Sequence, residues 1–186
     1  MEKKSPKKLK RLITKRNINS HKGDYGKLLI IAGSKGMSGA AILAGRAALK
    51  AGAGLVTIAC PVSERGIITA ALPEAMILPL MEKAGAPSLK AVREILKWQK
   101  IKKYDAALIG PGLSLVREAP LFALEIIKKL KMPMIIDADG LNALSFSTAA
   151  LKRLSASLVP YIMTPHLGEM RRLLKTESSN RKNLAF

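Results

Sequence analysis

The sequence is poor in cysteine and contains no long apolar run. Cys60 is the only cysteine among the 186 residues, so no intramolecular disulfide can form and no cysteine-based zinc site is available. No apolar stretch approaches the ~20 residues that a membrane-spanning helix needs. The basic first residues also lack the apolar core of a signal peptide. We therefore expect a cytoplasmic protein without a membrane segment, in which Cys60 packs in the interior.

Aromatic residues are also scarce, at 4%, whereas Lys and Arg outnumber Asp and Glu by 32 to 13 and give a net charge of +19. The first 22 residues are especially basic, and we interpret them as an arm that precedes one domain over residues 23–186. A surface of this charge attracts polyanions. However, no aromatic side chains alternate with the lysines, and the sequence has no Cys/His finger or RNP-type segment. These absences argue against dedicated nucleic-acid binding and favour a solvated surface that weakly attracts anionic metabolites.

Four apolar segments lead directly into turns of small residues. They end near Ala32, Ile109, Ile136 and Met163. Each is continuously apolar, as is typical of a parallel strand buried on both faces, and each is followed by a helical pattern. This alternation predicts an α/β fold of three layers, with helices on both faces of a mostly parallel sheet. Because ligands bind at the carboxyl ends of such strands, the four turns should lie along one edge.

The same reading gives bounds for the individual elements. We expect strands at 27–32, 55–59, 75–80, 105–109, 134–137 and 160–164. We expect helices at 38–51, 64–72, 89–101, 117–131, 140–145, 148–155 and 167–175. Ser63 and Ser88 are the expected N-caps of the second and third helices, and residues 82–87 are expected to form a loop.

Two of the four turns are rich in glycine. The segment Gly33-Ser34-Lys35-Gly36 opens a helix, so it either offers backbone N–H groups to a phosphate or other anion, or is a structural turn. Its spacing matches neither a Walker sequence nor a dinucleotide fingerprint. The turn Gly110-Pro111-Gly112 either lets a ligand approach the backbone or is a plain turn.

The other two turns carry polar side chains. Asp137 and Asp139 follow one strand and are candidates for metal coordination, for accepting a substrate hydroxyl, or for capping the next helix. His166 and Glu169 follow another strand. A histidine at such a strand end is either structural or a ligand contact, and the neighbouring polar turns favour the ligand contact.

Six short segments follow one another in an informative order. They are 21–27 (His-Lys-Gly-Asp-Tyr-Gly-Lys), 31–34 with Gly39 and Ala40, 51–56 (Ala-Gly-Ala-Gly-Leu-Val), 109–113 (Ile-Gly-Pro-Gly-Leu), 137–142 (Asp-Ala-Asp-Gly-Leu-Asn) and 164–169 (Thr-Pro-His-Leu-Gly-Glu). In this order they resemble the ADP/ATP-dependent NAD(P)H-hydrate dehydratases, over about residues 20–175. The resemblance implies a ribokinase-like fold and a metabolite-repair lyase. Such an enzyme uses ADP or ATP to phosphorylate hydrated NADH or NADPH and then eliminates phosphate.

The resemblance also implies roles for individual residues. Ala40, Gly112 and His166 would contact the hydrated dinucleotide, and Asp137 and Asn142 would help to shape the site. The cofactors would be ADP or ATP and Mg²⁺, with no metal site of the protein's own. A homotetramer is the implied assembly.

The chain departs from the family pattern in two places. The family's nucleotide loop and its general-base Asp lie beyond the segment that ends here near Lys175, so no catalytic or nucleotide-binding residue is assigned and the domain is expected to be incomplete at its C-terminal end. Apolar faces that the further segments would cover should then be exposed. Ser114 also stands where the family usually has a glycine. The alternatives are a dinucleotide-binding fragment without catalysis, or a small-molecule kinase of the same superfamily. The lack of a Gly-Ala-Gly-Asp anion hole weakens the kinase alternative.

Overall fold

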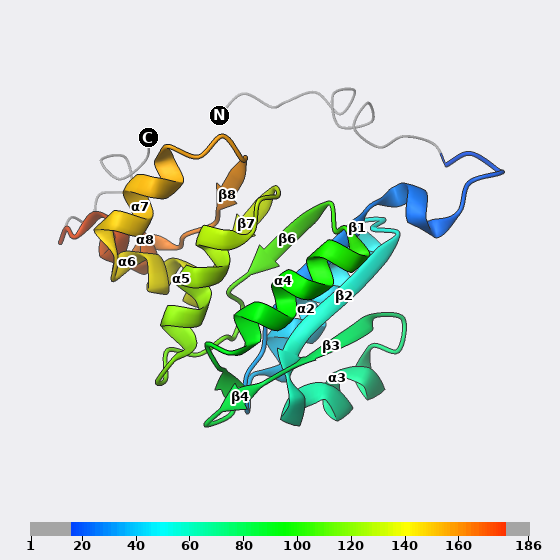
Figure 1. Ribbon diagram of the computed structural model, residues 1–186, viewed down its shortest axis with the longest axis horizontal. Coiled ribbons are helices and arrows are strands. Elements are labelled where there is room, and N and C mark those ends of the chain that lie inside the picture. Colours follow the sequence, from blue (N-terminus) through cyan, green and yellow to red (C-terminus); the bar gives the residue numbers. More distant parts are fainter. Residues whose placement is uncertain (1–15, 178–186) are drawn as a thin grey trace.

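The protein is built on a parallel sheet with helices on both faces (Figure 1), as described for residues 16–177 of a computed structural model. Six strands lie in the order β3-β2-β1-β6-β7-β8, and every neighbouring pair is parallel. The strands are β1 (Lys27–Ile31), β2 (Leu55–Pro61), β3 (Met76–Leu80), β6 (Ala106–Ile109), β7 (Met134–Ile136) and β8 (Tyr161–Met163). The fold class predicted from the sequence is confirmed.

Helices connect the strands at close to the predicted positions. The α-helices are α2 (Ser38–Lys50), α3 (Arg65–Ala71), α4 (Ala91–Lys102), α5 (Ala119–Lys129), α6 (Asp139–Ser145), α7 (Thr148–Ser155) and α8 (Leu167–Leu174). Two short 3₁₀ helices, η1 (Lys22–Tyr25) and η2 (Val62–Glu64), precede β1 and α3. Within residues 16–177 no helix is long and apolar enough to cross a bilayer.

The alternation of side chains along β1 explains why its sequence is apolar throughout. Leu29 and Ile31 lie in one buried cluster, together with residues of α4, α5 and α6. Ile30 lies in a second cluster, together with residues of α2 and α3. Successive side chains of a strand point to opposite faces, and here both faces are covered by helices. The expected three layers are therefore present.

One face of the sheet becomes progressively exposed toward β8. Ile30, Leu108, Ile135 and Ile162 occupy matching positions on the neighbouring strands β1, β6, β7 and β8. Ile30 is completely buried, whereas Ile135 is 38% and Ile162 is 61% exposed. Within the described residues β8 is the last strand on this side. The exposed apolar face predicted from the sequence is present, and it lies on β7 and β8.

Residues 82–87 are not a simple loop, and this sequence prediction is wrong. They form an antiparallel hairpin of β4 (Glu82–Lys83) and β5 (Ala86–Pro87). Ala84 and Gly85, between the two strands, have φ angles of 54° and 75°. Positive φ at both central residues is typical of the turns that match the twist of a hairpin. The hairpin lies against the loop after β1, where the Lys35 N–H donates to the Gly85 carbonyl over 2.7 Å.

The predicted N-caps Ser63 and Ser88 are also wrong. Neither precedes its helix directly, and neither side chain caps it. Carboxylates from distant parts of the sequence bind the N–H groups near these helix starts instead. Glu82 accepts from the Ser63 N–H at 2.9 Å, and Glu118 accepts from the Leu89 N–H at 3.1 Å. These tertiary contacts satisfy N–H groups that a local cap would otherwise bind.

The predicted arm is described only from Arg16 onward, and its residues 1–15 lie outside the described part. The Arg16 guanidinium donates to the Gly52 carbonyl at 3.0 Å and lies 4.4 Å from the centre of the Tyr25 ring. The end of the arm therefore contacts the domain. The proposed boundary at residue 22 stays a prediction.

Candidate functional site

The four turns singled out in the sequence lie on four adjacent strands. These strands are β1, β6, β7 and β8, and they are parallel neighbours in the sheet. Their carboxyl ends form one edge, which we call the rim: residues 32–37, 110–118, 137–138 and 164–166, together with the first turn of the helix that follows each of these segments. The parallel order is what brings these turns together, because each connection returns the chain to the opposite end of the sheet.

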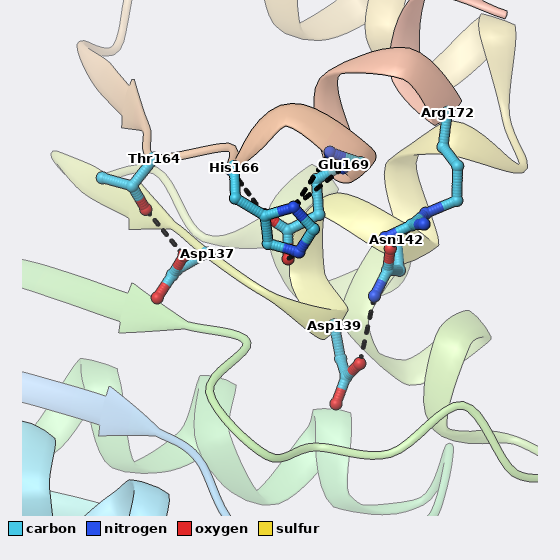
Figure 2. A network of polar contacts seen from close by, with 8 residues as sticks. Asp137, Asp139, Asn142, Thr164, His166, Glu169 and Arg172 are labelled. Atoms are coloured by element: carbon cyan, nitrogen blue, oxygen red, sulfur yellow. Dashed lines mark hydrogen bonds and ion pairs between the residues drawn. The ribbon is translucent and has the colours of Figure 1, made fainter. Parts of the chain in front are cut away.

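Asp137 and Thr164 join the turns after β7 and β8. The Thr164 hydroxyl donates to Asp137 Oδ1 over 2.8 Å (Figure 2). Asp137 is half-buried and Thr164 is exposed. β7 already ends at Ile136, so Asp137 belongs to the turn rather than to the strand. Its carboxylate keeps a second oxygen that can accept a hydrogen bond at the rim.

Asp139 does not cap α6, although capping was one reading of the sequence. The N-cap is Ala138, which has a φ of 48° and no capping side chain. The Asp139 carboxylate instead binds two other groups. Its Oδ2 accepts from the Ser114 N–H at 2.8 Å, and its Oδ1 accepts from the Asn142 amide at 3.2 Å. Asp139 thus links the turn after β7 to the turn after β6.

The glycines of the turn after β6 allow neighbouring backbones to approach closely. A Cβ added to Gly110 would lie 1.7 Å from the Asp137 carbonyl oxygen, so only glycine fits there. A Cβ added to Gly112 would lie 3.0 Å from the Ala40 Cβ, so Ala40 and Gly112, predicted to bind the same substrate, lie side by side. Ser114 has a φ of 72°, which costs a residue with a Cβ roughly 1–2 kcal/mol.

The glycine loop after β1 leads into the N-terminus of α2, where a buried carboxylate is found. Glu64 is 4% exposed and accepts from the Ser38 hydroxyl at 2.9 Å. Ser38 is the first residue of α2. A negative charge close to this helix end is favourable. The protein therefore supplies its own anion near this N-terminus, and binding of an external anion by the loop stays a prediction.

His166 is the N-cap of α8. Its ring Nδ1 accepts from the backbone N–H groups of Gly168 and Glu169, at 3.0 and 3.4 Å. The backbone N–H of His166 donates to Glu169 Oε2 at 2.9 Å. The second ring nitrogen, Nε2, lies 3.2 Å from Glu169 Oε1. Within the part of the chain that the structure describes, every hydrogen bond found for His166 stays inside its own segment. The ring remains 67% exposed and open to a ligand.

Arg172 is joined to Asn142 and, through it, to Asp139, but sequence reasoning did not single it out. Its Nε donates to Asn142 Oδ1 over 2.9 Å, which joins α8 to α6 (Figure 2). Sequence reasoning also missed Glu64 and its contact with Ser38. A charged residue on the first or second turn after a rim segment is the signal that could have found Arg172, whereas Glu64 follows β2, which is not one of the rim strands. That signal is weak in a chain with 45 charged side chains other than His, of which 32 are Lys or Arg.

Cys60 has no place in the candidate chemistry. It is fully buried in β2. Burial, together with the negative charges of Glu64 and Glu82, raises the pKa of its thiol to about 12. The thiol is therefore protonated and unreactive near neutral pH. The expectation of buried packing is confirmed.

A separate hollow lies at the other end of the strands. It has a volume of about 580 Å³ and lies between α5, α7 and the residues that precede β8. Leucine and alanine are the commonest residues in its walls, and its only carboxylate, Glu125, is paired with Lys128 and Lys129. The interacting carboxylate, imidazole and amide groups gather at the rim instead. We therefore take the rim as the candidate site.

The fold is that of an α/β protein of the ribokinase-like class, with polar side chains gathered at the carboxyl ends of its strands. A family model described as NAD(P)H-hydrate dehydratase matches residues 28–185. The chain belongs to this family.

Individual relatives support the same assignment. The chain is 40% identical to the bifunctional NAD(P)H-hydrate repair enzyme of Moorella thermoacetica, over 90% of this chain and 31% of that protein. It is 37% identical to the ADP-dependent (S)-NAD(P)H-hydrate dehydratase of Listeria monocytogenes, over 93% of this chain and 58% of that protein. The chain therefore spans from about a third to somewhat over half of the length of these relatives.

Solved structures agree with the fold. The ADP/ATP-dependent NAD(P)H-hydrate dehydratase of Bacillus subtilis, co-crystallized with ATP/Mg²⁺, matches with a TM-score of 0.62 and 30% identity, over 88% of this chain and 52% of that chain. A ribokinase-like superfamily protein of Enterococcus faecalis matches with a TM-score of 0.67 and 25% identity, over 90% of this chain and 56% of that chain. The ribokinase-like fold expected from the sequence is confirmed.

Proposed function

We propose that this chain acts in the ADP- or ATP-dependent dehydration of hydrated NADH or NADPH, with the dinucleotide bound along the rim. The match of residues 28–185 to the NAD(P)H-hydrate dehydratase family carries the proposal. The rim is consistent with it. Ala40, Gly112, Asp137 and Asn142 are half-buried, and His166 is exposed, so a ligand can reach all five residues.

The proposed reaction has two steps. The terminal phosphoryl group of the nucleotide moves to the hydroxyl oxygen of the hydrate, and the hydroxyl proton goes to a base. The C–O bond then breaks, phosphate leaves with the bonding electrons, and loss of a ring proton restores the double bond. Phosphorylation helps because phosphate is a far better leaving group than hydroxide. We assign no catalytic base within residues 16–177.

The rim residues would bind and orient the substrate. Because Ala40 and Gly112 are small and lie side by side, the dinucleotide can approach the backbone closely there. Asp137 can accept a hydrogen bond from a substrate hydroxyl through its second oxygen, while Thr164 holds the first. The exposed edge of the His166 ring would contact the dinucleotide. These groups position the substrate and do not themselves transfer the phosphoryl group.

Mg²⁺ would enter with the nucleotide. Within residues 16–177, no three side chains of His, Cys, Asp or Glu form a group that could hold a metal ion. Mg²⁺ is commonly bound through substrate phosphates and only one or two carboxylates, so such a protein cage is not required. We derive no step from a metal site of this chain.

A spectroscopic assay tests the proposal. The full chain is incubated with hydrated NADH, Mg²⁺ and either ADP or ATP, and the recovery of NADH absorbance is followed. We expect recovery that requires the nucleotide and that differs between ADP and ATP. Absence of recovery with both nucleotides would contradict the proposed catalysis.

Two alternative functions predict different results when the same chain is assayed. Calorimetric binding of hydrated NADPH without any recovery of absorbance indicates a dinucleotide-binding protein that does not turn over its ligand. Nucleotide-dependent phosphorylation of a vitamin or sugar from a substrate panel, with no effect on the hydrate, indicates a small-molecule kinase.

The assembly and the location stay predictions. We propose the homotetramer that the family resemblance implies, and the exposed Ile135 and Ile162 provide apolar surface for association. Light scattering combined with size-exclusion chromatography measures the mass directly, and a monomer at all concentrations would contradict the proposal. The cytoplasmic location is tested by cell fractionation.

A further inference from the structure

We propose that Arg172 and Asp139 are positioning residues, which act through Asn142 to hold the Gly112 turn in its substrate-binding conformation. The proposal rests on the proposed function, because it concerns the same dinucleotide site. It adds two residues that would not touch the ligand themselves. We call the connected side chains Arg172, Asn142 and Asp139 the strap.

The strap is a continuous path of hydrogen bonds across three segments. Arg172 Nε in α8 donates to Asn142 Oδ1 over 2.9 Å, and Asn142 Nδ2 in α6 donates to Asp139 Oδ1 over 3.2 Å. Asp139 Oδ2 then accepts from the Ser114 N–H over 2.8 Å. Figure 2 shows the three side chains in this order, with Asn142 between the other two.

The donor and acceptor groups of the strap side chains allow only one arrangement of the hydrogen bonds between them. A guanidinium only donates and a carboxylate only accepts, so the central residue must accept on one side and donate on the other. The amide of Asn142 does both. An isosteric aspartate at position 142 would place two carboxylates together, and a leucine would break both bonds. The amide orientation is thus fixed from both ends.

The strap ends at Ser114, where the backbone has an unfavourable conformation. Ser114 has a φ of 72°, a conformation that residues with a Cβ rarely adopt, and it lies two residues after Gly112. Its N–H binds the Asp139 carboxylate rather than a backbone carbonyl. Without this acceptor, an alternative conformation of the turn becomes more favourable. Such a change would move Gly112 away from Ala40, which lies in contact with it.

The strap also connects the separate parts of the proposed substrate surface. Ala40 and Gly112 lie next to each other, whereas His166 is on the segment that leads into α8. Arg172 is in the same helix that His166 caps. A hydrogen-bond path from α8 to Ser114 therefore fixes the spacing between His166 and Gly112. Spacing of this kind matters because misplacing a positioning group weakens binding without removing any ligand contact.

The test combines hydrogen exchange with ligand binding in the full chain. In Arg172→Met, whose side chain has no N–H donor, we expect about tenfold faster exchange of the Ser114 amide, because loss of the strap allows local opening. We expect the dissociation constant for hydrated NADPH to rise about tenfold as well. Arg172→Lys restores a donor to Asn142 and should recover part of both effects.

Arg153→Met is the matched control. Arg153 is an exposed arginine of α7, away from the rim, and its replacement removes the same charge. We expect wild-type exchange at Ser114 and wild-type affinity. A general loss of charge attraction would instead weaken binding equally in both methionine variants and would overturn the proposal.

The outcomes separate this proposal from the proposed function. Unchanged exchange at Ser114 in Arg172→Met overturns the strap, whatever the wild type binds. Faster exchange with unchanged affinity shows a purely structural contact and overturns the positioning role. If the wild-type chain itself binds no hydrated dinucleotide, the proposed function fails and the positioning role fails with it. The exchange data then report only on the hydrogen-bond path.

Discussion

The two histidines of the chain lie in the same local motif but in different surroundings. His21-Lys22-Gly23-Asp24 and His166-Leu167-Gly168-Glu169 both read His-x-Gly-acid, and both histidines cap the helix that follows. In each, ring Nδ1 accepts from the glycine N–H, at 3.1 and 3.0 Å. In each, the histidine N–H donates to the acidic side chain, at 3.0 and 2.9 Å. The motif is therefore a capping box built with histidine.

The two motifs differ in their acidic residues and in their positions. The Asp24 side chain is 48% exposed and lies before β1, whereas that of Glu169 is only 7% exposed and lies beside the rim. The longer Glu169 side chain also reaches ring Nε2, whereas Asp24 contacts Nδ1. The capping geometry alone therefore does not identify a functional histidine. Burial of its partner and position at the rim are what set His166 apart.

Removing the acidic residue should give the largest difference between the two motifs. Glu169→Ala removes the buried acceptor of the His166 backbone N–H. We expect this to lower the free energy of unfolding by about 1–3 kcal/mol. Asp24→Ala exposes the corresponding N–H to water and should cost about 0.5–1 kcal/mol. Denaturant unfolding of both variants measures the difference.

Glu169→Gln is the control for the charge. It keeps the acceptor oxygen and should lose less stability than Glu169→Ala. Equal losses in Glu169→Ala and Asp24→Ala would show that burial of the acid does not distinguish the motifs.

Replacing each histidine by asparagine separates capping from ligand contact. Asparagine is a good N-cap, so His166→Asn and His21→Asn should each change the free energy of unfolding by less than about 0.5 kcal/mol. His166→Asn should still weaken binding of hydrated NADPH about tenfold, or ~1.4 kcal/mol, because the imidazole ring is lost from the rim. His21→Asn should bind as the wild type does. Calorimetric titration of both variants measures the affinities.

Two outcomes would contradict this prediction. Wild-type affinity in His166→Asn would leave His166 as a capping residue only, as His21 is. Equally weaker binding in both variants would show that the effect does not come from a contact of His166 at the rim.

The sequence predicted the sheet well because the strands are covered on both faces. The strand ending at Ile31 needs apolar side chains at every position, and the absence of polar interruptions marks it. The turns could be placed on one edge for the same reason, since parallel strands all end there. Nearly all of the errors at helix ends are small.

The features that the sequence did not predict depend on distant partners. The hairpin at residues 82–87 has strands of only two residues, and it is held by Lys35 and by Lys83, which pairs with Glu118 at 2.6 Å. Ser63 and Ser88 looked like caps because only neighbouring residues could be considered. The bond between Asp139 and Ser114 spans 25 positions in the sequence. Such contacts become visible only once the chain is folded.

The glycine of each motif provides the smallest and most specific test. An added Cβ would lie 3.1 Å from the His21 ring at Gly23, and 3.0 Å from the His166 ring at Gly168. Neither glycine has a positive φ, so alanine meets no backbone strain at either position. The gain in helix propensity, at most ~1 kcal/mol, offsets the crowding. Gly23→Ala and Gly168→Ala should therefore unfold at nearly the same denaturant concentration as the wild type.

Their effects on ligand binding should nevertheless differ. To relieve the contact, each ring must shift by a few tenths of an ångström, and only the His166 ring lies at the rim. Gly168→Ala should thus raise the dissociation constant for hydrated NADPH about threefold, or ~0.7 kcal/mol, while Gly23→Ala leaves it unchanged. A small shift that weakens binding would mean that the position of the ring matters as well as its presence. If Gly168→Ala binds normally while His166→Asn does not, the ring contacts the ligand through a surface that tolerates this displacement.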